Sequence, residues 1–236
     1  MAGGMSASLQ KAYLAPFVVF MGLLAVGEAV AHLFEGQDIW FASAPRYWVF
    51  PLQTVVCGIL LARYWRHYEW RAPARLGFTI AVAVFVFVLW ISPQIFFGSP
   101  PRTDGFDPGY FGGGWAFALN VTVRFIRLVI VVPLLEEIFW RGFLLRYLIR
   151  EPFESVPLGT FSWSSFLWVT VFFGLAHYGG GFWPPGPDFV PALATGMLYN
   201  AVAYRTKSLS SCVLAHAITN ALLGIYILRT GQWGFW

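Results

Sequence analysis

The sequence predicts an all-α fold, a polytopic transmembrane helical bundle with about seven or eight spans. Of its 236 residues, 58% are hydrophobic and 19% aromatic, while 11% are charged. Soluble domains average roughly 25% charged residues, so this composition excludes that class. The hydrophobic residues also come in long runs, close to the roughly 20 residues that a helix needs to cross a bilayer. A transmembrane β-barrel would show alternating segments of about 10 residues instead.

The hydrophobic runs that are candidate spans cover residues 12–34, 46–65, 76–98, 126–149, 162–178, 189–204 and 208–228. The segment 113–125 leaves three interpretations open: an interfacial helix, a short eighth span, or the first part of a long tilted fourth span. Segments 99–109 and 178–188 are rich in glycine and proline, which is typical of turns. Because no internal repeat is visible, we treat residues 1–236 as a single membrane-embedded domain.

Basic residues between the spans indicate an orientation. Arginine and lysine concentrate in the segments 63–75, 146–150 and 205–207. By the positive-inside rule these segments and the N-terminus would face the cytoplasm. Arg124 and Arg127 do not fit this scheme, because they would open the fourth span from the opposite side. Topology explains the net charge of +4, so we expect a lipid bilayer and no nucleic acid as the partner.

The stretch LLEEIFWRGF, residues 134–143, places two adjacent carboxylates in an apolar run. Glu137 and Arg141 are four residues apart with the acid first, which is the favourable order for an ion pair on a helix. Glu136 points about 100° away and has no such partner in its own helix. An ionised carboxylate at a bilayer centre costs about 2.5 kcal/mol or more. The pattern therefore predicts one paired acid and one free acid, next to a kink at Pro133.

Two further polar pairs lie in hydrophobic segments, Phe173-x-x-x-His177 and His216-x-x-x-Asn220. Residues four apart share one face of a helix. Taken singly, a histidine or asparagine in a span is often only a hydrogen-bonding residue between helices. That interpretation does not explain why Glu136, both histidines and Asn220 occur at compatible depths. Together they predict a shared cavity inside the membrane.

An acid, two imidazoles and a carboxamide suit the hydrolysis of an amide by activated water. Glu136 could act as the general base, with His177 sharing the proton or orienting the water. His216 and Asn220 could donate hydrogen bonds to the oxyanion that develops on the scissile carbonyl. Alternatively, Glu136, His177 and His216 could form a zinc site with one open position. The expected cofactor is therefore none, with zinc as the alternative.

Three motifs in order carry a family resemblance: EEIFWRGF at 136–143, FFGLAH at 172–177 and LAHAITN at 214–220. They resemble the motifs of the CAAX prenyl protease and bacteriocin-processing family (CPBP, also called Abi) of intramembrane endopeptidases. The resemblance covers about residues 125–228, which would form the catalytic core. The first three spans carry nothing specific.

The resemblance implies a role for each motif residue. Glu136 and His177 would activate water, and His216 and Asn220 would form the oxyanion site. The supporting residues would be Glu137, Arg141 and Phe173. The family implies a metal-free glutamate mechanism, although a zinc mechanism stays open.

The leading hypothesis is an intramembrane endopeptidase that cleaves a membrane-associated protein or peptide. The compact chain resembles the bacterial members of the family, so we expect it in the bacterial cytoplasmic (inner) membrane. Two other function classes stay open. One is a non-enzymatic membrane protein, such as a bacteriocin-immunity or scaffold factor. The other is a proton-coupled carrier, because intramembrane glutamate and histidine also build proton relays.

Overall fold

The computed structural model describes residues 2–177 and 188–236, and the regular secondary structure in these residues is helical. One continuous helical rod runs from Trp115 to Tyr147. Its α-helical parts are α5 (Trp115–Phe125), α6 (Val132–Glu137) and α7 (Leu145–Tyr147), and π-helical turns cover Ile126–Val131 and Ile138–Leu144. The other helices are α1 (Ala2–Leu33), α2 (Trp40–Ser43), α3 (Arg46–Tyr64), α4 (Leu76–Phe96), α8 (Trp163–Ala176), α9 (Phe189–Thr206) and α10 (Leu209–Thr230).

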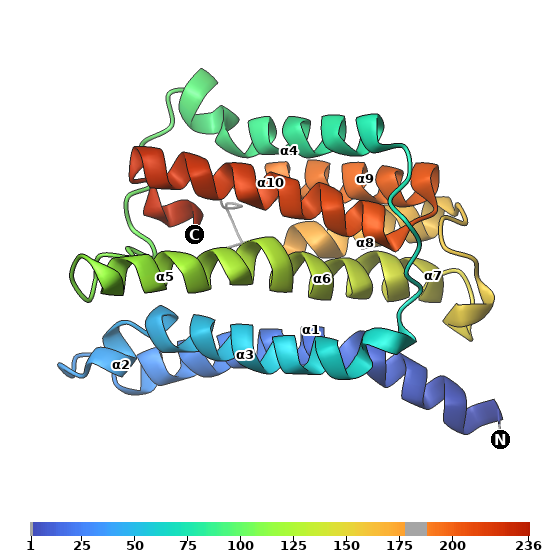
Figure 1. The fold of residues 1–236 in the computed structure, drawn as a ribbon, viewed down its shortest axis with the longest axis horizontal. Helices are drawn as coiled ribbons and strands as arrows, with labels where there is room; N and C mark the ends of the chain where they lie inside the picture. The colour runs from blue at the N-terminus through green and yellow to red at the C-terminus, as the bar shows by residue number, and fades with distance from the viewer. Residues whose placement is uncertain (1, 178–187) are drawn as a thin grey trace.

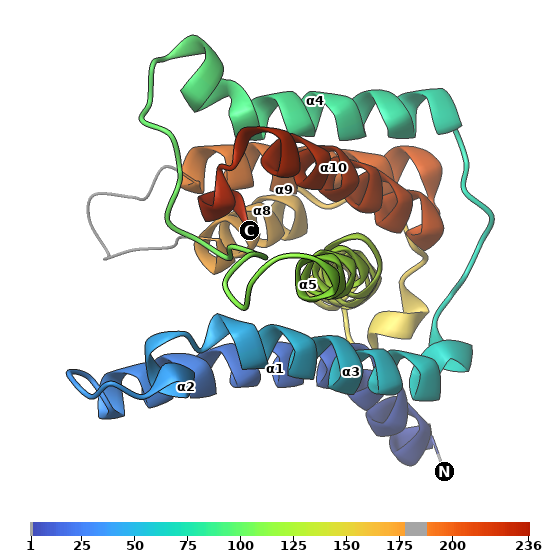
Figure 2. The same cartoon turned by 60° about the vertical axis from the view of Figure 1, so that its left-hand side comes forward.

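The rod lies in the middle of the bundle, with α1 and α3 on one side and α4, α8, α9 and α10 on the other (Figures 1 and 2). Each side packs on it through an apolar cluster. Leu135 and Ile138 of the rod belong to the cluster with α1 and α3. Trp140 and Leu145 belong to the cluster with α4, α8, α9 and α10. The charged side chains on the rod are therefore buried between these two layers: Arg124, Arg127, Glu136, Glu137, Arg141 and Arg146.

Five helices are long and apolar enough to cross a membrane: Ala7–Leu33, Arg46–His67, Leu76–Phe96, Trp115–Tyr147 and Leu209–Thr230. Among the described residues this confirms an all-α, multi-pass bundle, and the expected count of seven or eight spans stays a prediction. The apolar helix α8 has 14 residues, or about 21 Å at about 1.5 Å per residue, against about 30 Å of hydrocarbon. In α9 the apolar run is interrupted by Asn200 and Arg205.

The segment 113–125 takes the third of its possible forms, the first part of a long fourth span. The helix begins at Trp115, not near residue 126. Arg124 and Arg127 consequently lie inside the helix, only 3% and 5% exposed. They are buried in protein and do not belong to a loop, which is why loop charges could not account for them.

The expected irregularity at Pro133 takes the form of a π-helical register. The Val132 N–H donates to the Arg127 carbonyl, five residues back. In the same register the Leu128 carbonyl would accept from residue 133, but proline has no N–H. The Asn220 amide supplies the missing donor, with Nδ2 2.8 Å from the Leu128 oxygen. The missing N–H of Pro133 thus leaves the Leu128 carbonyl available to Asn220, and this hydrogen bond joins α10 to the rod.

The basic segments gather at one end of the bundle, together with the N-terminus (Figure 1). The Ser208 hydroxyl, just before α10, is 3.1 Å from the Arg71 carbonyl in the segment between α3 and α4. Arg146, at the end of the rod, forms an ion pair with Glu69 of the same segment. This grouping is what the positive-inside rule requires, and the side that this end faces stays a prediction. Of the turn segment 178–188, residues 178–187 lie outside the described residues.

Candidate active site

A cavity in the interior brings together four of the predicted site residues. Glu136 comes from the rod, His177 from the end of α8, and His216 and Asn220 from α10. Phe173 also lines this cavity, whereas Glu137 and Arg141 lie behind it. The catalytic roles of these residues remain a proposal.

Glu136 is the free acid of the site. It is 7% exposed, and its Oε2 atom has no hydrogen-bond partner among the described residues. A buried carboxylate without a partner is costly to keep, because it has lost its hydration without compensation. Its place on the cavity wall means that a water molecule or a substrate group can supply the missing contact.

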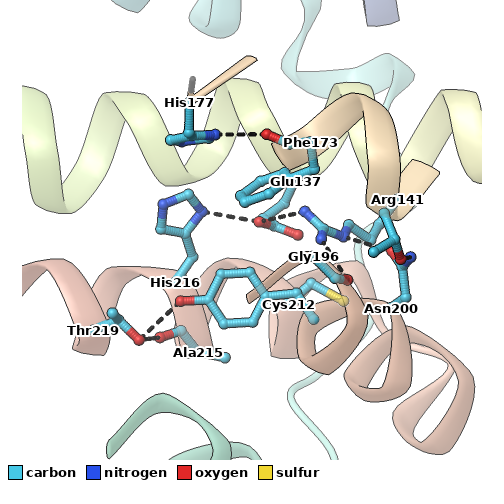
Figure 3. A network of polar contacts seen from close by, with 12 residues as sticks. Glu137, Arg141, Phe173, His177, Gly196, Asn200, Cys212, Ala215, His216 and Thr219 are labelled. Atoms are coloured by element: carbon cyan, nitrogen blue, oxygen red, sulfur yellow. Dashed lines mark hydrogen bonds and ion pairs between the residues drawn. The ribbon is translucent and has the colours of Figure 1, made fainter. Parts of the chain in front are cut away.

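Glu137 is the paired acid, fully buried behind the cavity. Its Oε1 accepts from Arg141 Nη1 at 3.2 Å and lies 2.9 Å from His216 Nδ1 (Figure 3). Oε2 has no partner in the described part of the chain. Oε1 already accepts from the Arg141 guanidinium, so it is also the acceptor for the imidazole. His216 therefore carries a proton on Nδ1, which leaves its Nε2 for the cavity.

Arg141 is held on every side of its guanidinium. Besides Glu137, it donates from Nε to Asn200 Oδ1 at 3.1 Å and from Nη2 to the Gly196 carbonyl at 3.2 Å. Its Cζ atom lies 4.8 Å from the centre of the Phe173 ring. The spacing of Glu137 and Arg141 predicted the ion pair, and the structure shows it. The same arginine also joins the rod to α8 and α9.

His177 is the first residue after α8, and its own helix orients it. Nδ1 lies 2.8 Å from the Phe173 carbonyl oxygen, and the ring stacks on the Phe173 ring at 4.5 Å between centroids. A carbonyl oxygen only accepts, so Nδ1 carries the proton and Nε2 keeps a lone pair. Both histidines of the site are thus oriented through Nδ1, and in the described part of the chain Nε2 has no hydrogen-bond partner in either ring.

Asn220 makes one hydrogen bond that the structure shows, and it can donate a second. A carboxamide has two N–H donors. One of them is used at the Leu128 carbonyl, and the other remains for a group in the cavity. On the same cavity wall, the Tyr199 ring packs on His216 at 5.3 Å between centroids, and the Tyr199 hydroxyl donates to Thr219.

Three polar residues of this region were missed at the sequence level: Arg127, Tyr199 and Asn200. Arg127 and Tyr199 line the cavity, and Asn200 is fully buried against Arg141. A signal existed for Arg127 and Asn200, because polar side chains inside apolar helices mark functional or structural sites. From the sequence, Arg127 was interpreted only as a charge that bears on membrane orientation.

The alternative zinc ligands do not form a metal centre as they are placed. In the described ranges, no three His, Cys, Asp or Glu residues are arranged to hold a metal ion. Glu136, His177 and His216 line one cavity without forming such a group. We derive no step through a metal.

Membrane-length helices around a buried cavity, with a free carboxylate and two oriented imidazoles, are the architecture of an intramembrane enzyme. Residues 118–222 match the family model described as type II CAAX prenyl endopeptidase Rce1-like. Residues 118–222 thus form an Rce1-like domain, a type of domain found in proteases, and the apolar helices indicate an integral multi-pass membrane protein. A search of curated proteins and a search of solved structures found no match.

Proposed function

We propose that the protein is an intramembrane endopeptidase that hydrolyses a peptide bond of a membrane-associated protein or peptide. We place it in the bacterial cytoplasmic membrane. The observation that carries this proposal is the unpaired Glu136 carboxylate on one cavity with His177, His216 and Asn220. The family match supports the protease class and a protein or peptide substrate.

In the first step, Glu136 takes a proton from a water molecule as the water oxygen attacks the carbonyl carbon of the substrate. His177 offers Nε2 as a second acceptor, which orients the water. General bases of this kind contribute about 10²–10⁴-fold to the rate. The attack converts the carbonyl into a tetrahedral intermediate with a negatively charged oxygen.

In the second step, Asn220 and His216 stabilise that oxyanion. Asn220 donates its remaining N–H. His216 donates from Nε2 only as an imidazolium, because its Nδ1 proton is held by Glu137, 2.9 Å away. Glu137 accepts the Nδ1–H of His216, and Arg141 holds Glu137 in place. The C–N bond then breaks, and the proton on Glu136 passes to the leaving nitrogen, which gives a carboxylic acid and an amine.

The proposal is tested with purified protein in proteoliposomes and a library of N-palmitoylated decapeptides, with products identified by mass spectrometry. We expect paired products with a new carboxyl end and a new amino end. Proton uptake driven by a pH gradient in the same vesicles, without peptide cleavage, would instead establish a carrier. If the protein neither cleaves peptides nor transports protons, the non-enzymatic class is the one that remains.

A further inference from the structure

The cavity has a second charged residue, separate from the catalytic group. Arg127 lines the same cavity and is 5% exposed. It lies nine residues before Glu136 on the rod, which is about 13 Å along the helix at about 1.5 Å per residue. The acidic side chain of Glu136 and the cationic side chain of Arg127 therefore come from different positions along the cavity.

The Arg127 guanidinium is fixed in place. Nε and Nη2 both donate to Gln53 Oε1, at 3.0 and 2.8 Å. Gln53 cannot turn its amide around, because its Nε2 donates to the Phe20 carbonyl at 2.8 Å. The rings of Phe20 and Phe50 pack against the guanidinium at 4.9 and 4.2 Å. A rigid cation of this kind is preorganised for a ligand.

Arg127 differs from Arg141 and Arg146 of the same rod in having no acidic partner among the described residues. Arg141 pairs with Glu137, and Arg146 pairs with Glu69. Among the residues that the structure describes, Arg127 binds only the neutral Gln53, and its Nη1 has no hydrogen-bond partner. Glu136 interacts with it electrostatically, but beyond ion-pair distance. A buried charge is normally paired.

We infer that Arg127 binds a carboxylate of the substrate while Glu136 acts on the scissile bond. This inference rests on the proposed function and adds a specificity residue to it. The Nη1–Nη2 end of the guanidinium matches a planar carboxylate, which arginine binds with two parallel hydrogen bonds. The carboxylate would be a free C-terminus or an acidic side chain a few residues beyond the cleaved bond.

The competing explanation is that Arg127 only balances the charge of Glu136 across the cavity. The two explanations differ in what the arginine discriminates. A carboxylate site distinguishes a peptide acid from the matching amide. A counter-charge would affect both forms of the peptide equally.

The test uses one N-palmitoylated decapeptide in three forms: a free C-terminal carboxylate, a C-terminal carboxamide, and a carboxamide preceded by aspartate. Backbone N-methylation makes a second set that cannot be cleaved, so that binding is measured without turnover. We expect wild-type protein to bind the free acid about ten- to a hundredfold more tightly than the amide, the usual effect of a charge-assisted hydrogen bond. Equal binding of the two forms overturns the inference.

Arg127→Gln should abolish this preference. Arg127→Lys should keep part of it, because the positive charge remains but the planar pair of N–H donors is lost. The matched control is Arg124→Gln, which removes a buried arginine of the same rod that does not line the cavity. The control should keep the full preference. If Arg127→Gln weakens the binding of both peptide forms equally, Arg127 is only a counter-charge. If this variant does not fold, the ratio of acid to amide affinity in wild type and in Arg127→Lys decides. Tight binding of the aspartate form would identify an acidic side chain as an accepted source.

The two proposals fail separately. Cleavage of the acid and the amide at the same rate, with equal binding, rejects the carboxylate site and leaves the protease. Preferred binding of the free acid without cleavage of any peptide rejects the protease and leaves the carboxylate site.

Discussion

The Nδ1 atom of His216 lies 2.9 Å from Oε1 of Glu137, the same oxygen that accepts from Arg141. One buried carboxylate oxygen therefore anchors an arginine of its own helix and orients an imidazole of α10. The two adjacent glutamates consequently have different tasks. Glu137 organises the site from behind, and Glu136 faces the cavity.

Arg141→Met should lower the free energy of unfolding by about 3–5 kcal/mol, because it leaves Glu137 buried without its counter-charge. Glu137→Leu combined with Arg141→Met should recover much of that loss while cleavage stays absent, since His216 has lost its acceptor. Unfolding in mixed micelles and peptide cleavage measure the two effects. Wild-type cleavage by the double variant would show that Glu137 has no part in catalysis.

Asn220→Ala should cost about 1–3 kcal/mol of stability, because the Leu128 carbonyl loses its donor. Adding Pro133→Ala returns an N–H to the position that the π-helical register assigns to this carbonyl, so stability should recover. Cleavage should remain about a hundredfold or more below wild type in both variants, because the oxyanion donor is still missing. Recovery of cleavage together with stability would make Asn220 purely structural.

His177→Ala should reduce cleavage by about a hundredfold or more and change stability by less than about 1 kcal/mol. The reason is that its hydrogen bond to the Phe173 carbonyl is local, within its own helix. His67→Ala, at an exposed position, is the control and should leave both quantities unchanged. A thermal-unfolding measurement in detergent accompanies the kinetic assay. A stability loss that accounts for the whole activity loss would argue against a role for His177 in water activation.

Cleavage should persist in the presence of a strong zinc chelator, because Glu136, His177 and His216 do not form a group that could hold a metal ion among the described residues. The measurement is the cleavage rate before and after dialysis against the chelator, followed by addition of zinc. Loss of activity that zinc restores would replace the glutamate–water scheme by a metal mechanism.

The sequence was most informative where the relevant geometry lies within one helix. The spacing of Glu137 and Arg141 predicted their ion pair, and the lack of a partner at the same spacing singled out Glu136. The order of the three motifs led to the family. The grouping of the basic segments at one end of the bundle also followed from their positions between apolar runs.

What depends on the placement of one helix against another could not be predicted. The bond between Glu137 and His216 joins two segments 79 residues apart, and the Gln53–Arg127 contact joins segments 74 apart. The π-helical register around Pro133 could not be predicted, because it leaves no recognisable pattern of apolar residues in the sequence. The number of spans stays a prediction, because an apolar run such as 162–178 does not reveal the length of its helix, which is 14 residues for α8.

The most direct test of the central claim compares Glu136→Gln with wild type in single-turnover cleavage of a peptide that the wild type accepts. Glu35→Gln, an exposed acid, serves as the matched control. If Glu136 removes the proton from water, Glu136→Gln should unfold at the wild-type temperature and lose at least about a hundredfold in rate, while the control keeps full activity. Cleavage by Glu136→Gln at the wild-type rate would contradict the account.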